Sequence, residues 1–358
     1  MENEIKSAIS YFTYFSYPPT SQEIYTFFKK KTSTGHFTSI LEKMVKKGAV
    51  IRWKIDGRRL KMEKRTKNRV LSSTFHLLNS SYSLPRYTLG EYSTLGKISN
   101  LPPSLKLRRT SKSQISKVRS FEIRKRISKK KIKKIDRYVN LLSIFPQIKL
   151  IGLSGSVAML NADEDHDIDL FIITDKNRLW TGRLISLLLV SILGLRRKRN
   201  RFKAKDKVCL NLFFDEARLD MPKYKRTEYV AHEILQMRPL VNKNNVYGAF
   251  LEQNKWVYKI FPNASRVIAS TSMSLRAKRS NLRVNSAKQF HFNQIASSSR
   301  IRGIPRNDKS IIGNILEYIL KILQLNIIKL HQTTEIVTDT QLWFHPDDFG
   351  KKIRLNRV

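Results

Sequence analysis

The stretch from 151 to 174, IGLSGSVAMLNADEDHDIDLFIIT, constrains the fold of this 358-residue chain more than any other part. Apolar runs at 148–153 and 168–173 have the length of buried strands. Asp167 and Asp169 have one residue between them, so on a strand both side chains leave the same face. The intervening Ile168 leaves the opposite face, where it can enter a core. The stretch therefore predicts two core strands, with paired carboxylates at the start of the second.

Two carboxylates this close predict a cation site, because without a cation they repel each other and one loses its charge. Hard oxygen ligands suit Mg²⁺, which proteins commonly hold with one or two carboxylates plus substrate phosphates. Between the strands lies the turn Ser154-Gly155-Ser156. Gly155 allows close approach of the backbone to a phosphate, and Ser156 offers a hydroxyl and an N–H at a helix start. The pattern favours a nucleotide and metal site; the alternative is a calcium-type acidic loop or a solvated turn.

The motifs Gly155-Ser156 and Asp167-Ile168-Asp169, with ten residues between them, resemble the signature of the nucleotidyltransferase superfamily with the DNA polymerase β-like palm. The flanking residues are similar to a bacterial group of uncharacterised nucleotidyltransferase-domain proteins. This resemblance implies an α/β (α+β) fold with a mixed β-sheet. It also implies Mg²⁺-dependent transfer of a nucleoside monophosphate from an NTP to a hydroxyl acceptor, which the sequence does not identify. Asp167 and Asp169 would hold the metal, and Ser154, Gly155 and Ser156 would cradle the phosphates.

The third expected strand, 208–214, departs from that family. The family usually carries a third carboxylate here, which binds metal and acts on the attacking hydroxyl, whereas this chain has Asn211. An amide cannot accept the proton and is a poorer Mg²⁺ ligand. Asp215 shares the strand parity of Asn211 but lies about 13 Å further along, so it would need a bend to reach the site. The alternative function is therefore a catalytically impaired nucleotide-binding regulator, or a DNA-binding or antitoxin-like partner.

Two further groups near the expected core are candidates for function. Arg178 and Arg183 flank the start of a long apolar helix within a segment that resembles the same group, and they would face the triphosphate or only cap and solvate the helix. His232 and Glu233 are adjacent, so on a helix they point about 100° apart and do not form a metal pair. We expect them to be surface or supporting groups.

Residues 1–65 predict three helices followed by a hairpin with an Asp56-Gly57 turn. This order resembles a winged helix-turn-helix, in which the third helix and the wing meet nucleic acid. Six basic residues give that face the right charge: Lys43, Lys46, Lys47, Arg52, Arg58 and Arg59. Such domains also serve as protein-docking modules, so both partners stay open.

The rest of the chain completes a five-part organisation. A basic linker and entry helix occupy 66–138, with the helix expected at 117–138; the nucleotidyltransferase core occupies 139–262. A basic insertion follows at 263–309, which resembles translated intergenic repeats of bacterial genomes, the alternative being a basic RNA-binding arm. The extension 310–358 carries an apolar stripe, 311–329, that is expected to dock on the core.

The composition bounds partners and compartment. A formal net charge of +41 favours contact with a polyanion such as nucleic acid, although part of that charge lies in the expected insertion. The single cysteine, Cys209, falls in an apolar run and excludes a disulfide framework. The run 184–195 is too short to span a membrane, and no signal peptide is evident. We expect a cytoplasmic protein with no membrane association.

Overall fold

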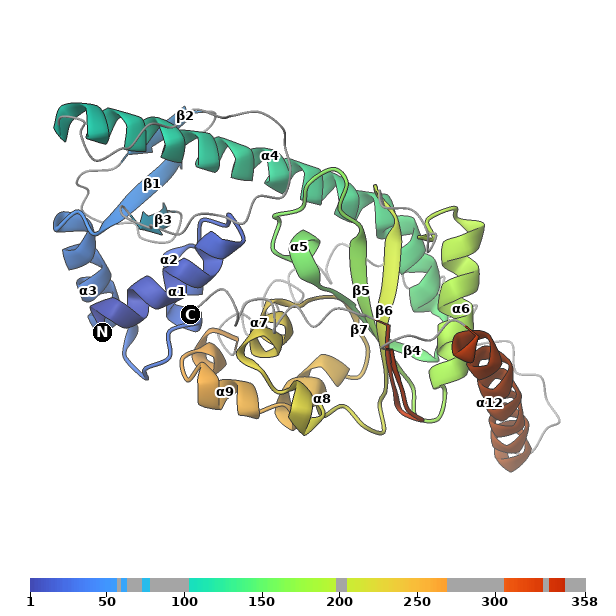
Figure 1. Ribbon diagram of the computed structural model, residues 1–358. Helices are drawn as coiled ribbons and strands as arrows, with labels where there is room; N and C mark the ends of the chain where they lie inside the picture. The colour runs from blue at the N-terminus through green and yellow to red at the C-terminus, as the bar shows by residue number, and fades with distance from the viewer. Residues whose placement is uncertain are drawn as a thin grey trace, which may run out of the picture. The chain divides into compact units, whose positions relative to one another are not determined.

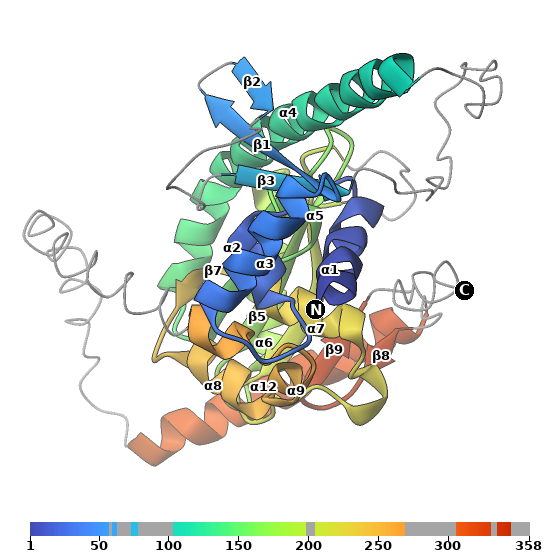
Figure 2. The ribbon, with the colours of Figure 1, turned by 90° about the vertical axis from the view of Figure 1, so that its left-hand side faces the viewer.

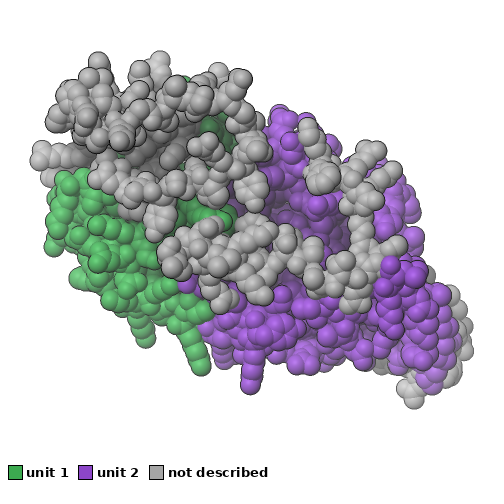
Figure 3. All heavy atoms as spheres, in the orientation of Figure 1, with its two compact units in different colours: residues 1–126, 258–267 green, residues 127–257, 268–358 purple. Residues whose placement is uncertain are grey.

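The computed structural model describes residues 1–56, 59–62, 73–77, 103–197, 205–268, 306–330 and 335–344. They form two compact units, coloured separately in Figure 3: residues 1–126 with 258–267, and residues 127–257 with 268–358. The chain is α/β, and its larger sheet is mixed and six-stranded. The expected turn at Gly57, most of the 66–102 linker and the basic insertion from 269 to 305 lie outside the described residues.

The first unit contains the three predicted helices and the predicted hairpin (Figure 2). The helices are α1 (Glu2–Tyr14), α2 (Ser21–Thr26) and α3 (Thr34–Lys46), and the hairpin strands are β1 (Val50–Asp56) and β2 (Arg59–Met62). Thr20 caps α2 through a reciprocal capping box with Glu23, as the Thr-x-x-Glu spacing indicates. A third strand, β3 (Ser73–Leu77), pairs antiparallel with β1 inside the expected linker.

Three side chains of this unit bear on the predicted basic face. Lys43 and Lys46 are exposed on α3. Arg52, in contrast, is 5% exposed and pairs with Glu42. Burying an arginine requires such a carboxylate partner, so Arg52 stabilises the fold and is not part of the exposed basic face.

The second unit is built on the sheet with strand order β7-β4-β5-β6-β9-β8 (Figure 1). The helix α4 (Pro103–Ile144), longer than expected, enters it. The strands are β4 (Ile148–Leu153), β5 (Ile168–Thr174), β6 (Val208–Asp215), β7 (Arg238–Asn242), β8 (Ile336–Val337) and β9 (Gln341–Trp343). β4 and β5 are antiparallel, whereas β5 and β6 are parallel and joined through α6 (Leu179–Ile192).

The two faces of this sheet pack against different helices. Ile168, Leu170 and Ile172 join the buried cluster that includes residues of α4 and α6. The opposite face carries Phe171, whose ring lies 5.2 Å from that of Phe250 on α8 (Val246–Gln253). On this second side lie α5 (Gly155–Ala158), α7 (Glu228–Gln236) and α8 (Figure 1). Strand parity therefore directs Asp169 to the side of α5 and α7, away from the α4–α6 core.

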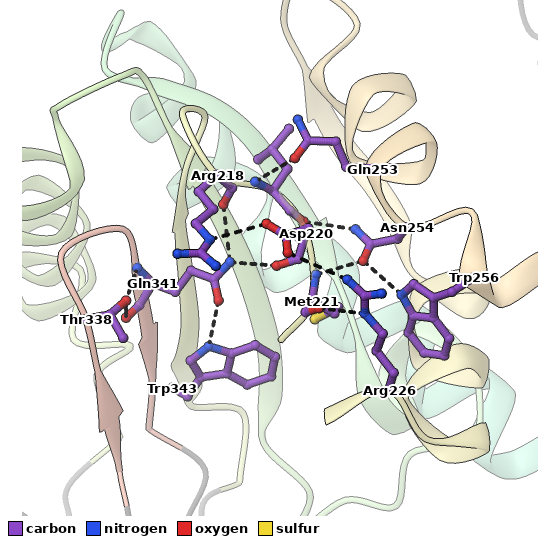
Figure 4. Close-up of polar contacts among 11 residues, drawn as sticks. Arg218, Asp220, Met221, Arg226, Gln253, Asn254, Trp256, Thr338, Gln341 and Trp343 are labelled. Atoms are coloured by element: carbon purple, nitrogen blue, oxygen red, sulfur yellow. Dashed lines mark hydrogen bonds and ion pairs between the residues drawn. The ribbon is translucent and has the colours of Figure 1, made fainter. Parts of the chain in front are cut away.

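The connection after β6 is held by a network of neutral and charged groups (Figure 4). It runs through the short 3₁₀ helix η2 (Lys223–Lys225) toward α7, and α9 (Trp256–Ile260) follows α8. The Asn254 amide accepts hydrogen bonds from the Met221 N–H and the Trp256 indole, at 2.8 and 3.1 Å. Gln341 of β9 donates to the carbonyl oxygens of Arg218 and Asp220. These bonds satisfy backbone groups of residues 218–221, which lie between β6 and η2 and belong to no helix or strand.

The helix α12 (Arg306–Lys329) packs on the core with Leu320, Leu325 and Ile328 and on α6 with polar groups as well, whereas most of its predicted apolar stripe is exposed. The Glu317 carboxylate accepts hydrogen bonds from the backbone N–H groups of Trp180 and Thr181, at 2.6 and 2.9 Å. The first N–H groups of a helix lack intrahelical partners, so a carboxylate is favoured there. Six residues of the predicted stripe face solvent, each with an exposed fraction between 41 and 60%. They are Ile312, Ile315, Leu316, Ile319, Ile322 and Leu323.

One helix among the described residues, 311–329, is long and apolar enough to cross a membrane, judged by length and composition only. Only 17% of that window is buried. A single helix of this kind is weak evidence of a membrane span.

Candidate metal and phosphate site

The register of β4 against β5 brings the glycine–serine turn onto the paired carboxylates. Leu153 pairs with Leu170, and the Ser154 N–H then donates to the Asp169 carbonyl at 3.1 Å. Gly155 follows with φ +63°, a conformation that side chains disfavour. A Cβ added there would lie 2.6 Å from Asp169 Oδ2. Only glycine lets the turn lie this close to the carboxylate. The Gly155-Ser156 motif and the Asp167-Ile168-Asp169 motif therefore form one site.

A buried lysine of α4 fixes the loop that leads into β5. Lys131 is 1% exposed, and its ammonium donates to the carbonyl oxygens of Glu164 and His166 at 2.8 and 2.7 Å. The third bond goes to Asp206 Oδ1 at 3.1 Å. All three ammonium protons thus have acceptors, which compensates for burial of the charge. This clamp orders the backbone immediately before Asp167.

The same loop engages the hydroxyl of Ser156. The Asp163 N–H donates to His166 Nδ1 at 3.3 Å, so this ring nitrogen is an acceptor. Ser156 Oγ lies 3.2 Å from the same nitrogen and donates to it. The hydroxyl is therefore oriented by the loop, and its oxygen lone pairs remain available to donors.

Asp167 and Asp169 differ in their surroundings. Asp167 is 20% exposed and pairs with Arg197 Nη1 at 2.5 Å. Asp169 accepts a hydrogen bond from Asn211 Nδ2 at 2.9 Å. Burial raises the pKa of Asp169 to about 8, with smaller contributions from the negative charges of Asp167 and Glu233. A bound cation would favour the charged form of Asp169 and lower this pKa.

Asn211 lies at an irregularity of β6. Asp169 pairs with Cys209 and Leu170 with Leu210, but Phe171 pairs with Leu212, so Asn211 is an extra residue on β6. Such bulges redirect a side chain and are frequent next to functional sites. The Cys209 thiol donates to Asn211 Oδ1 at 2.7 Å, which leaves the amide nitrogen to face Asp169. In this orientation Asn211 is a donor to the site and not a ligand.

Three side chains form a group that could hold a metal ion: the ligand atoms of Asp167, Asp169 and Cys209 lie within 4.8 Å of one another. The thiol is the weakest of the three, because burial first and the two carboxylates second raise the pKa of Cys209 to about 12. A protonated thiol is a poor ligand, whereas two carboxylates suit a hard cation. The donor set therefore fits a cation such as Mg²⁺.

The other predicted residues lie in different places. Asp215 pairs with Thr174 at the far end of β5, and the bulge at Asn211 does not bring it to the carboxylates. Arg178 follows that same end and binds Asn314 Oδ1 at 2.8 Å. Arg183 donates to Gln324 Oε1 at 2.6 Å and lies over the Phe344 ring. The structure thus gathers Asp167, Asp169, Asn211 and the turn 154–156, and it positions Arg178 and Arg183 toward α12.

Three residues near the carboxylates were not predicted to belong to the site itself: Cys209, Arg197 and Glu233, the last of which was expected at the surface or in support. Cys209 stands two positions before Asn211, so strand parity alone would have identified it. Glu233 is half-buried on α7; burial raises its pKa, and hydrogen bonds from the Gly155 N–H and from Tyr229 act in the opposite direction. Arg197 belongs to a run of basic residues, and nothing in the sequence distinguishes it from its neighbours. His232, expected at the surface or in support, is 2% exposed.

No protein-family model, curated protein or solved structure matches this chain.

Proposed function

We propose that this chain binds a nucleoside triphosphate together with Mg²⁺ and transfers its nucleoside monophosphate, slowly, to a hydroxyl acceptor. The observation that carries the proposal is the close approach of the Gly155 backbone to the Asp169 carboxylate. A Cβ at position 155 would lie only 2.6 Å from Asp169 Oδ2. A glycine turn beside two carboxylates puts donors for a phosphate next to ligands for a cation. This combination has a chemical reason in Mg²⁺-bound polyphosphate and none in packing alone.

The cation would be held by Asp167 and Asp169. Bound there, Mg²⁺ would neutralise the phosphate oxygens and the developing charge of the leaving group. The Ser156 N–H would donate to a phosphate, because the Ser154 and Gly155 N–H groups already donate to the Asp169 carbonyl and to Glu233, and the Lys131 clamp would keep that geometry fixed. Membership of the polymerase β-like palm family, and a cytoplasmic location, belong to the same proposal.

Asn211 sets the expected rate. Its amide nitrogen donates to Asp169, so it supports the charged form of that carboxylate but has no basic atom to take a proton from the acceptor. General-base assistance is typically worth about 10²–10⁴-fold, whereas positioning and charge stabilisation supply most of phosphoryl-type catalysis. A slow transferase is the expected result.

The orientation of Asn211 also favours a second candidate function, a nucleotide-binding regulator that performs no transfer. In that case the first unit, which we propose is a winged helix-turn-helix, would deliver the signal to nucleic acid through exposed lysines such as Lys43 and Lys46. The two candidates share the nucleotide site and differ only in whether a product forms.

Incubation with each of the four α-labelled NTPs, Mg²⁺ and cell lysate separates them. Transfer of label to a lysate component, lost in Asp169→Asn and retained in Asp220→Asn, would support the transferase. Asp220 is a suitable control because it pairs with Arg218 in the same unit but at the other end of β6. Nucleotide binding with no labelled product under any condition would leave the regulator as the better function.

A further inference from the structure

Arg197 occupies the position beside the carboxylates that a cation would take. Its Nη1 lies 2.5 Å from Asp167 Oδ2 and 3.6 Å from Cys209 Sγ. The side chain comes from the segment directly after α6, which is held against β6 by the Val208 N–H bond to the Leu195 carbonyl at 2.8 Å. Backbone pairing therefore anchors the base of this arginine at the site, while the side chain itself is 42% exposed.

The charges around Arg197 explain why it rests there. Asp167 and Asp169 lie together with Cys209 in a group within 4.8 Å, and Glu233 adds negative charge from α7. Of these carboxylates Asp167 is the one that the guanidinium contacts. Like charges at this separation are unfavourable without a counter-charge, and the guanidinium supplies one. The chain thus holds an internal cation, Arg197, on the carboxylate that a metal would need.

A divalent cation and Arg197 compete for the same carboxylate, that of Asp167. When the metal binds, the guanidinium loses that partner but remains tethered beside the site by the backbone of 195 and 196, where Arg196 bridges to Val208. A triphosphate carries more negative charge than one divalent cation neutralises, and a guanidinium fork matches phosphate oxygens with two parallel donors. The nearest new acceptor for Arg197 is then the phosphate that the metal brings.

We propose that Arg197 is a phosphate-binding side chain of this site, and that it rests on Asp167 until a divalent cation and a polyphosphate replace that contact. The inference rests on the proposed function and assigns to Arg197 the role expected of Arg178 and Arg183. It predicts opposite effects of one substitution on two ligands, which a purely structural ion pair would not produce.

The test compares wild type, Arg197→Ala, Arg197→Lys and the control Arg218→Ala. Arg218 also pairs with an aspartate of the same unit, at 3.3 Å, but beyond the far end of β6. Two probes are titrated by calorimetry: Mg²⁺ alone, and inorganic tripolyphosphate in saturating Mg²⁺. Tripolyphosphate isolates phosphate recognition from recognition of a base, and thermal melting checks that each variant is folded.

In Arg197→Ala we expect Mg²⁺ alone to bind up to about fivefold tighter, because a partly exposed ion pair no longer competes. We expect tripolyphosphate to bind about 10- to 100-fold weaker, because a charge-assisted bond is lost. Arg197→Lys should fall between, since it keeps the charge without the planar fork. Arg218→Ala should match wild type for both probes.

Two results would overturn the inference, and they are distinguishable. If wild type binds both probes and Arg197→Ala binds them equally well, Arg197 is a structural partner of Asp167 and the proposed function stands. If folded wild type and folded Arg197→Ala both fail to bind Mg²⁺ and tripolyphosphate, the proposed function fails, and the inference fails with it.

Discussion

The two ends of the β5–β6 pair both carry aspartates, but these aspartates are satisfied in different ways. At the far end, Asp215 is 2% exposed and accepts the Ala217 N–H at 2.8 Å, with further backbone hydrogen bonds from Asn177 and Arg178. At the near end, Asp167 and Asp169 receive side-chain partners, Arg197 and Asn211. Beyond the far end, the network of Figure 4 joins polar groups to backbone and to one another.

The kind of partner separates a structural carboxylate, Asp215, from carboxylates that are available to a ligand, Asp167 and Asp169. A backbone donor is fixed by the fold, so replacing it requires partial unfolding. A guanidinium on an exposed side chain can leave without disturbing the sheet. The near end therefore exchanges partners at low cost, whereas the far end does not.

The largest expected effect comes from removing one carboxylate at each end. Asp169→Ala should weaken Mn²⁺ binding, followed by electron paramagnetic resonance, by about 100-fold or more, because a direct ligand is worth at least as much as an outer-shell partner. Asp215→Ala should leave Mn²⁺ binding unchanged but lower the free energy of unfolding by about 1–3 kcal/mol, because buried N–H groups lose their acceptor. Loss of Mn²⁺ binding in Asp215→Ala alone would reverse the assignment of the two ends.

Asn211→Asp should raise turnover by between about 10- and 1000-fold, up to the middle of the range of about 10²–10⁴-fold that a general base usually contributes, while NTP affinity in Mg²⁺ barely changes. The substitution also places a third carboxylate beside Asp169 and removes the amide that donates to it. The melting temperature without metal should therefore fall, and Mg²⁺ should restore it. Label transfer and melting curves measure the two effects. If wild type has a detectable rate and Asn211→Asp has the same rate, Asn211 does not occupy the position of a missing general base.

The pH dependence of stability should report the titration of Asp169, at the near end, in the absence of metal. The pKa of Asp169 is about 8 in the folded chain and about 3.9 in an unfolded one, so between these values the folded state binds the extra proton. The resulting stabilisation is fully present below about pH 4 and is lost as the pH rises toward 8. Melting temperatures in chelator should fall over that range, less steeply in Asp169→Asn, and Mg²⁺ should stabilise more at pH 8 than at pH 5.

The smallest effect is expected for Cys209→Ser. The thiol is protonated over the accessible range, and a hydroxyl can also donate to Asn211 Oδ1. Mg²⁺ affinity should stay within about twofold of wild type, the effect of a peripheral contact. A large loss of affinity would identify Cys209 as a ligand and favour a softer metal than Mg²⁺.

The sequence predicted the parts of the site that depend on local spacing. One residue between Asp167 and Asp169 determines that they share a face, and the apolar runs beside them determined the two strands. The three helices of the first unit and the β1–β2 hairpin followed from equally local patterns.

What the sequence could not provide depends on long-range contacts. The strand β3 was missed because its pairing with β1 bridges a segment without periodicity. The helix α12 packs on the core as expected, but with Leu320, Leu325 and Ile328, because the free N–H groups of α6 favour Glu317, a preference that apolar periodicity does not reveal. Arg197 reaches Asp167 across thirty residues, a contact that no local pattern encodes.

The most direct test of the central claim, that the near end of β5 and β6 binds a metal–triphosphate complex, is a calorimetric titration of NTP into the full chain. The titration is run in Mg²⁺ and again in chelator, for wild type and for Asp167→Ala. We predict saturable binding for wild type in Mg²⁺, and a collapse of affinity both in chelator and in Asp167→Ala. Equal affinity with and without Mg²⁺ would contradict the account.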